Sequence, residues 1–95
     1  MINFEKIIGL QVITLDAHIL GDVKGARIDT KLWDIKYLNV KLSEKAADRL
    51  GMKKRFGSST ISIPVGLVQA VGELVTLIKT MEELETAKEI VEYKD

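Results

Sequence analysis

The 95-residue sequence contains no cysteine, one histidine and one proline. The absence of cysteine excludes a disulfide scaffold, a cysteine-ligated zinc site and thiol chemistry. A single histidine excludes a multi-histidine metal site within one chain. No apolar run approaches the roughly 20 residues of a transmembrane helix, and the N-terminus lacks the basic start and long apolar stretch of a signal peptide. We therefore expect a cytoplasmic protein that requires no metal or organic cofactor.

A net charge is also missing, because fourteen basic residues balance fourteen acidic ones. Nucleic-acid-binding domains usually carry a basic excess or a basic face, so this balance argues against that class. The charges are unevenly distributed along the chain. Residues 82–95 hold six acids and two lysines, which leaves a net +4 on residues 1–81. The length and the hydrophobic fraction of 46% are those of one folded domain.

Apolar alternation and many β-branched residues predict a mainly β fold of about five to six short strands. The predicted strands cover residues 10–15, 19–29, 35–42, 60–65, 67–72 and 73–78. Gly21 and Gly25 within the second strand indicate a bulge or a close backbone approach. Ile61 and Ile63 should point inward, and Pro64 belongs at a strand end or on an edge because it donates no hydrogen bond.

The strand over residues 35–42 alternates in a way that predicts one solvated face, which carries Tyr37 and Asn39. After it the period changes. Ser43 is a good N-cap and Gly51 suits the position after a helix, which predicts a short helix at 43–50.

A second helix is predicted from about residue 80, because Thr80-Met81-Glu82-Glu83 matches a capping box. An apolar stripe at helical spacing follows, formed by Met81, Leu84, Ala87, Ile90 and Val91. We therefore divide the chain into a domain over residues 1–79 and an acidic amphipathic helix over 80–95. That helix must pack on the domain or on a second subunit, because an isolated helix of this length is marginal in water.

Three segments, in this order, resemble the PRC-barrel domain family. They are Ile8-Gly9-Leu10-Gln11-Val12, Ile19-Leu20-Gly21-Asp22-Val23 and Val71-Gly72-Glu73-Leu74-Val75-Thr76-Leu77. The family has a glycine before its first strand, a Leu-Gly-x-Val turn and a late Val-Gly-Asp-x-Val-x-Leu segment. Glu73 stands where the family often has Asp. The resemblance covers residues 5–79.

The resemblance implies a small antiparallel β-barrel of about six strands, closed or nearly closed. Free-standing members occur in archaea, and some resemble cell-division adaptors that connect membrane anchors with the division ring. Another member is a domain of a ribosome maturation factor. The family consists of protein-binding modules without shared catalytic residues, and the resemblance does not identify the partner.

No catalytic constellation accompanies these patterns. His18 follows Asp16 closely, but no motif marks a nucleophile nearby, so we interpret His18 as a solvated turn residue. Asp16, Asp22, Asp29 and Asp34 occur in successive turns and could in principle collect a cation. They lack the dense Asp-x-Asp-x-Asp spacing of a calcium loop, and Asp is a favoured turn residue. The sequence therefore assigns no catalytic, cofactor-binding or metal-binding residue.

Two groups of apolar residues are candidates for an interaction surface. Leu32 and Trp33 lie in a polar connection, where the tryptophan is either a plug over the end of the barrel or an exposed interface anchor. Leu84, Ile90 and Val91 belong to the tail stripe. A small barrel cannot easily bury all of these residues, which predicts a non-enzymatic homodimeric adaptor. Its other partner is an unidentified protein, for which the resemblance suggests a cell-division or membrane-anchored protein.

The alternative function is that of an RNA- or ribosome-associated factor. It rests on the basic loop of Lys53, Lys54 and Arg55 with the neighbouring Phe56, which can contact phosphates and stack on bases. The same loop could dock on an acidic protein surface. Three charges are too few for strong nucleic-acid binding, and no segment predicts direct insertion into a membrane.

Overall fold

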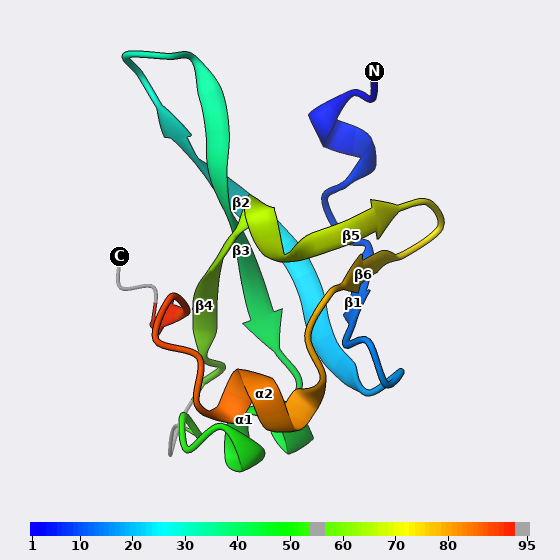
Figure 1. Cartoon of the computed structure of the whole chain (residues 1–95), viewed down its shortest axis with the longest axis vertical. Coiled ribbons are helices and arrows are strands. Elements are labelled where there is room, and N and C mark those ends of the chain that lie inside the picture. Colours follow the sequence, from blue (N-terminus) through cyan, green and yellow to red (C-terminus); the bar gives the residue numbers. More distant parts are fainter. Residues whose placement is uncertain (54–56, 93–95) are drawn as a thin grey trace.

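A computed structural model of the chain describes residues 1–53 and 57–92 (Figure 1). The fold is mainly β, with two short α-helices and two 3-10 turns. The strands are β1 (Gln11–Ile13), β2 (Ile19–Asp29), β3 (Asp34–Leu42), β4 (Thr60–Pro64), β5 (Val68–Val71), β6 (Val75–Leu77) and β7 (Val91–Glu92). The helices are α1 (Glu44–Arg49) and α2 (Met81–Glu85), and the 3-10 turns are η1 (Phe4–Lys6) and η2 (Val65–Leu67).

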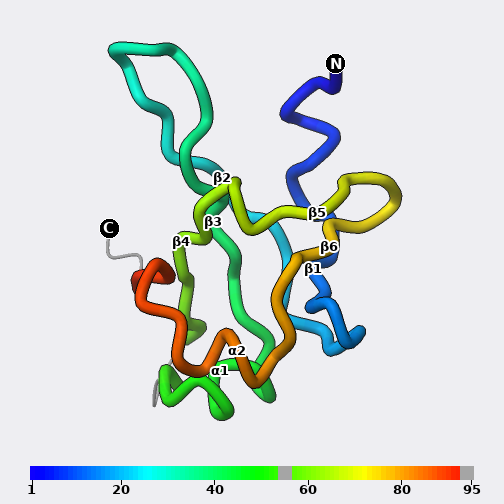
Figure 2. The backbone as a smooth tube through the Cα atoms, in the orientation of Figure 1, coloured from blue at the N-terminus to red at the C-terminus, as the bar shows by residue number. Residues whose placement is uncertain are grey.

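The seven strands of the described residues form one mixed sheet in the order β5-β6-β1-β2-β3-β4-β7. All neighbours are antiparallel except β1 and β6, which run parallel with Val12 opposite Val75. The strands β5 and β7 are the two edges, so the sheet is not closed and the prediction of a closed antiparallel barrel is wrong. The backbone path gives the reason (Figure 2). Pro64 ends β4 and η2 follows at once, which turns the chain away before β5, whose partner is β6.

The longest ladder joins β2 and β3, from Gly21 opposite Leu42 to Asp29 opposite Asp34. The far part of this hairpin projects from the body of the molecule (Figure 1). Both predicted roles of its glycines are confirmed. A Cβ at Gly21 would collide with the carbonyl oxygen of Lys41, and Gly25 lies at a shift of the register.

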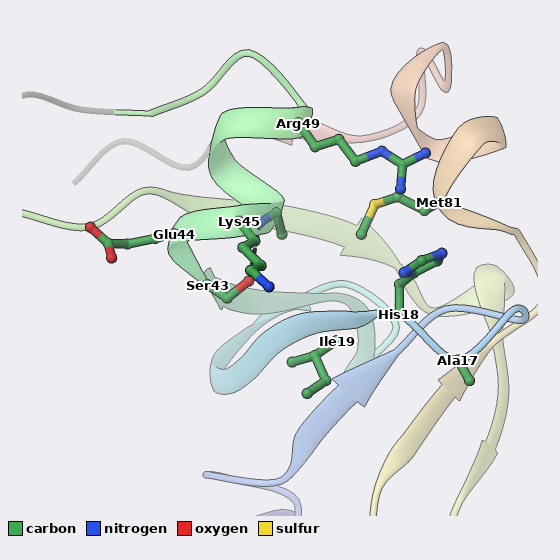
Figure 3. Close-up of a pocket in the computed structure, with 9 residues that line it drawn as sticks. Ala17, His18, Ile19, Ser43, Glu44, Lys45, Arg49 and Met81 are labelled. Carbon is green, nitrogen blue, oxygen red and sulfur yellow. Dashed lines mark hydrogen bonds between the residues drawn. The ribbon is translucent and has the colours of Figure 1, made fainter.

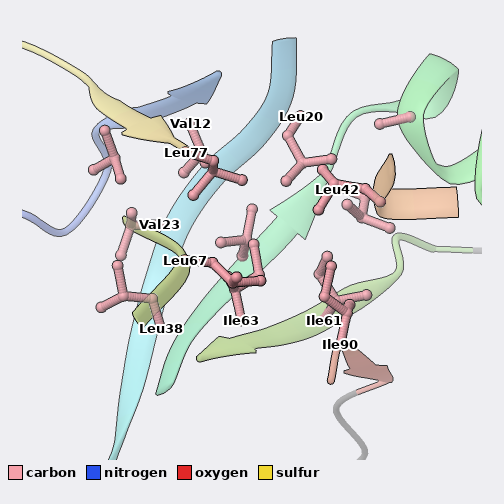
Figure 4. Close-up of a cluster of buried hydrophobic side chains, with 14 of the residues drawn as sticks. Val12, Leu20, Val23, Leu38, Leu42, Ile61, Ile63, Leu67, Leu77 and Ile90 are labelled. Carbon is pink, nitrogen blue, oxygen red and sulfur yellow. The ribbon is translucent and has the colours of Figure 1, made fainter. Parts of the chain in front are cut away.

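One core of buried apolar side chains holds the sheet together, with contributions from β1, β2, β3, β4 and β6 (Figure 4). Ile61 and Ile63 point into it, as predicted. Asn39 was predicted on a solvated face, but it is buried because β3 is an interior strand between β2 and β4. The Ser62 hydroxyl on β4 donates a 2.8 Å hydrogen bond to Asn39 Oδ1. This bond satisfies both buried groups, as burial of polar atoms requires.

Local sequence determines where the helices begin. Ser43 Oγ accepts a 3.1 Å hydrogen bond from the Ala46 amide at the start of α1, and Gly51 after the helix has a left-handed φ of 70°. The capping box of α2 is present in full, with Thr80 and Glu83 bonding each other's backbone amides. The predicted helix over 80–95 is nevertheless much shorter. It ends at Glu85, and the chain then turns and pairs as β7 with β4.

The two helices lie at the end of the molecule opposite the tip of the β2–β3 hairpin (Figure 1). A hydrogen bond of 2.8 Å between Arg49 Nε and Glu85 Oε1 joins α1 to α2. The molecule therefore has two separate ends, a helical end and a projecting hairpin.

Candidate interaction surface

The hairpin tip is a loop with a defined backbone. Asp29 Oδ1 accepts hydrogen bonds from the amides of Lys31 at 2.8 Å and Leu32 at 3.3 Å. The Asp29 carbonyl accepts a 2.7 Å bond from the Trp33 amide. Trp33 has a left-handed φ of 55°, a conformation that bulky residues rarely adopt. The local hydrogen bonds therefore stabilise one backbone conformation of the loop.

Large apolar side chains on this tip remain in solvent. Trp33 is 77% exposed and Leu32 is 65% exposed, and Ile28 on the adjoining part of β2 is exposed as well. The sequence left open whether Trp33 is a plug or an anchor, and in this chain it does not cover the end of the core. An exposed apolar cluster is informative because large apolar patches mark interaction sites.

Basic side chains flank the apolar tip. The Arg27 guanidinium lies 5.0 Å from the centroid of the Tyr37 ring, which faces it across the ladder. Such a cation–π contact at an exposed site contributes about 0.5–1 kcal/mol. Lys36 Nζ lies 3.4 Å from Asp34 Oδ2, an exposed pair that contributes little to stability. Residues 24–37 carry four basic and two acidic side chains, so the hairpin has a net positive charge.

The sequence also predicted a basic loop, of which the structure describes only Lys53. This residue does not lie at the hairpin tip. Lys53 is exposed and follows α1, at the helical end. Lys54, Arg55 and Phe56 lie outside the described residues.

The predicted tail residues divide into two kinds. Leu84 is 3% exposed and Ile90 is 9% exposed, and both belong to the core of the same chain. Val91, in β7, is 49% exposed. The apolar stripe of the tail is therefore covered mainly within one chain and leaves Val91 at the surface.

The turn between β1 and β2 is attached to the start of α2 through Asp16. Asp16 Oδ1 accepts a 2.6 Å bond from the Thr14 hydroxyl and a 3.1 Å bond from the Met81 amide. The hydrogen bond from Thr14 is the main reason that the pKa of the Asp16 carboxyl is lowered. His18 Nε2 lies 3.4 Å from Asp16 Oδ2, and both side chains are substantially exposed. Asp16 thus joins its turn to α2, whereas Asp29 accepts hydrogen bonds from the backbone of its own turn.

In residues 1–53 and 57–92, no three potential metal-ligating side chains gather at one place. None of the helices in this same part of the chain has the length and apolar character that crossing a membrane requires.

The sequence pointed to Leu32 and Trp33 but missed Ile28, Arg27 and Tyr37. Only the register of the β2–β3 ladder places those three beside the tip. Comparison of the chain with models of known protein families gave no match, and comparison with curated protein sequences gave none. The projecting hairpin, with exposed apolar residues at its tip and basic residues beside them, is accordingly the candidate interaction surface.

Proposed function

We propose that the chain is a non-enzymatic protein–protein interaction module that acts as a homodimeric adaptor, with the tip of the β2–β3 hairpin as its binding surface. The observation that carries this proposal is the exposure of Trp33 on a loop that its own hydrogen bonds hold in place. Tryptophan and arginine are enriched among the residues that dominate binding energy, and Arg27 lies on the same hairpin. A loop already fixed in one shape loses less entropy when it binds.

Charge distribution supports a second copy of the chain as one partner. The hairpin is basic, whereas residues 82–92 carry five acids and one lysine. In a two-fold dimer the hairpin of each copy can lie against the acidic segment of the other, so that the same contact forms twice. Such pairing would cover Leu32 and Trp33 and would add buried surface to a small domain.

The resemblance of three sequence segments to the PRC-barrel family supports the same class of function, because that family consists of protein-binding modules. The setting that the resemblance suggests is the cytoplasm of an archaeal cell, where an adaptor would connect a cell-division or membrane-anchored protein with other components. The second binding partner in this proposal is such a protein.

Sedimentation equilibrium of the purified chain tests the proposal. The wild type should be a dimer at micromolar concentration, and the double variant Leu32→Ser with Trp33→Ser should be a monomer that still unfolds cooperatively, at a lower temperature because it loses the stabilisation by association. Leu15→Ser is the matched control, because Leu15 is an exposed leucine outside the hairpin. A monomeric wild type, or a double variant that remains dimeric, would overturn the proposal.

RNA binding is the second candidate, and one observation favours it. The hairpin carries both basic and aromatic side chains, and Arg27 contacts Tyr37; the others are Lys24, Lys31, Lys36 and Trp33. Fluorescence anisotropy with single-stranded RNA distinguishes this function. Binding whose affinity falls steeply with salt concentration and is lost with Trp33→Ser would support RNA as the ligand. Absence of binding at low salt would eliminate it.

A further inference from the structure

A hollow of about 490 Å³ lies between α1, the start of α2 and the turn before β2 (Figure 3). Its volume falls in the usual range of ligand pockets, about 300–1,000 Å³. Its lining includes residues of α1 and the start of α2, and these helices lie at the end of the molecule opposite the hairpin tip (Figure 1). It is therefore a second potential binding site, independent of the proposed dimer surface.

Basic side chains from two parts of the chain line this hollow. Lys45 and Arg49 are four residues apart on α1, so they lie on one face of that helix. His18 enters from the turn before β2 and points toward Arg49 (Figure 3). The neighbouring Glu44 directs its carboxylate away from them (Figure 3). Lys45 forms no ion pair with another residue in the described ranges.

Glu85 holds Arg49 in place and occupies only one of the N–H groups of the guanidinium. The Nε–H group of Arg49 donates to Glu85 Oε1 at 2.8 Å. A guanidinium has five N–H donors, so the groups on both Nη atoms are not needed for this bond. A fixed guanidinium of this kind suits a planar carboxylate, which can accept two parallel hydrogen bonds.

Apart from Ser43 and Glu44, the remaining lining of the hollow is apolar. Ile19 and Met81 lie beside the basic groups (Figure 3), and Ala46 also lines the space. A second hollow of about 300 Å³ shares Ile19 and Ser43 with the first. Its other lining residues include the polar Gln11, Asp22 and Lys41. A ligand that extends from the first hollow into the second would meet an apolar region followed by polar groups.

We infer that the hollow binds a carboxylate carried on an apolar group, with Lys45 and Arg49 holding the carboxylate and Ile19 and Met81 contacting the apolar group. Inorganic phosphate would match the cations but leave the apolar wall in contact with water. Two sources present this chemistry, a free organic acid and the C-terminal residue of a peptide with an apolar side chain. The peptide would place its backbone in the second, polar hollow.

Titration followed by ¹H–¹⁵N NMR tests the inference on the intact chain. The probes are 4-methylpentanoate, its amide, and the peptide acetyl-Gly-Gly-Leu as the free acid and as the C-terminal amide. Each acid should cause saturable shifts of the amides of His18, Lys45 and Ala46. Each amide probe should bind about tenfold more weakly, as expected for loss of a charge-assisted hydrogen bond. Peptide acid that binds tighter than 4-methylpentanoate identifies a peptide C-terminus, and equal affinity identifies a small organic acid.

Two variants separate the site from general charge effects. Lys45→Gln should weaken binding of both acids about tenfold. Lys31→Gln is the matched control, since it removes the same positive charge at an exposed position of the hairpin that does not line the hollow, and it should leave the affinity unchanged. Absence of saturable shifts with both acids would overturn the inference, and so would equal affinities of acid and amide. These outcomes do not depend on the oligomeric state, so they are distinct from failure of the dimer proposal.

Discussion

The hairpin tip and the C-terminal tail both carry apolar residues that the sequence marks for interaction, yet the fold places them differently. Leu84 and Ile90 are buried in the core, whereas Leu32 and Trp33 stand in solvent. The tail residues Met81, Leu84, Ala87 and Ile90 recur at intervals of three positions, and β7 is paired with β4. The tip residues are adjacent in a turn beyond the last pair of the ladder. In this chain the regularly spaced apolar residues of the tail are buried or partly buried, whereas the two adjacent apolar residues in the turn are exposed.

The largest effect that this contrast predicts comes from truncation of the buried tail. Leu84→Ala should lower the free energy of unfolding by about 2–5 kcal/mol, because it removes buried contacts and leaves a cavity. Val91→Ala, at an exposed position of the same tail, should change it by less than about 0.5 kcal/mol. Urea denaturation followed by circular dichroism measures both. Equal effects would show that the tail is not packed as described.

The contrast can be sharpened within the hairpin, whose base is buried and whose tip is exposed. Gly21→Ala should destabilise the fold by about 1–3 kcal/mol, because the new Cβ collides with the carbonyl oxygen of Lys41 and the backbone must shift. Gly25→Ala should stay within about 1 kcal/mol of the wild type, since its Cβ would meet Asn39 Nδ2 at 3.8 Å. Thermal denaturation of the two variants makes the comparison. Similar midpoints would contradict the close approach at Gly21.

Smaller effects on stability are expected when the hydrogen bonds that stabilise the tail helix α2 and the hairpin tip are removed. Thr80→Ala removes the cap of α2 and should cost about 1 kcal/mol of global stability. Asp29→Ala removes the bonds to the tip amides and should cost less than about 0.5 kcal/mol globally, because the tip contributes little to the core. Its effect should instead appear as faster motion of the Leu32 and Trp33 amides in ¹⁵N relaxation. Unchanged relaxation would mean that Asp29 does not hold the loop.

The smallest predicted effect is a pH dependence confined to the helical end. The pKa of Asp16 is lowered chiefly by the Thr14 hydroxyl, and that of Glu83 chiefly by the Thr80 backbone amide. A carboxyl with a lower pKa in the folded chain adds stability that is complete above its unfolded pKa of about 4. That contribution is lost as the pH falls through the lowered folded pKa. Urea denaturation between about pH 5 and 2 should show this loss, and Asp16→Asn should reduce it.

Local features of the fold could be predicted from the sequence because short-range chemistry determines them. Ser43 and Gly51 begin and end α1, Thr80 and Glu83 cap α2, and Pro64 ends its strand. The positions of the two glycines in the long hairpin were also predictable. Each of these features depends on residues within one turn or one strand.

The open sheet could not be predicted because it depends on pairings between distant segments. Nothing local to Val12 or Val75 indicates that they pair in parallel. The end of the predicted helix, Val91–Glu92, is instead an extended edge strand, because β4 offers a partner and the core accepts the preceding Ile90. Likewise, Trp33 could be recognised as unusual, but its exposure followed only from the length of the β2–β3 ladder.

The parallel pair of β1 and β6 has a consequence for synthesis of the chain. Val12 leaves the ribosome well before its partner Val75 has been synthesised. Contacts between such distant positions form slowly, because a long loop must close before they stabilise the fold. A nascent chain that stops before β6 therefore leaves β1 with one side unpaired. We expect this domain to complete its folding only after β6 has been synthesised.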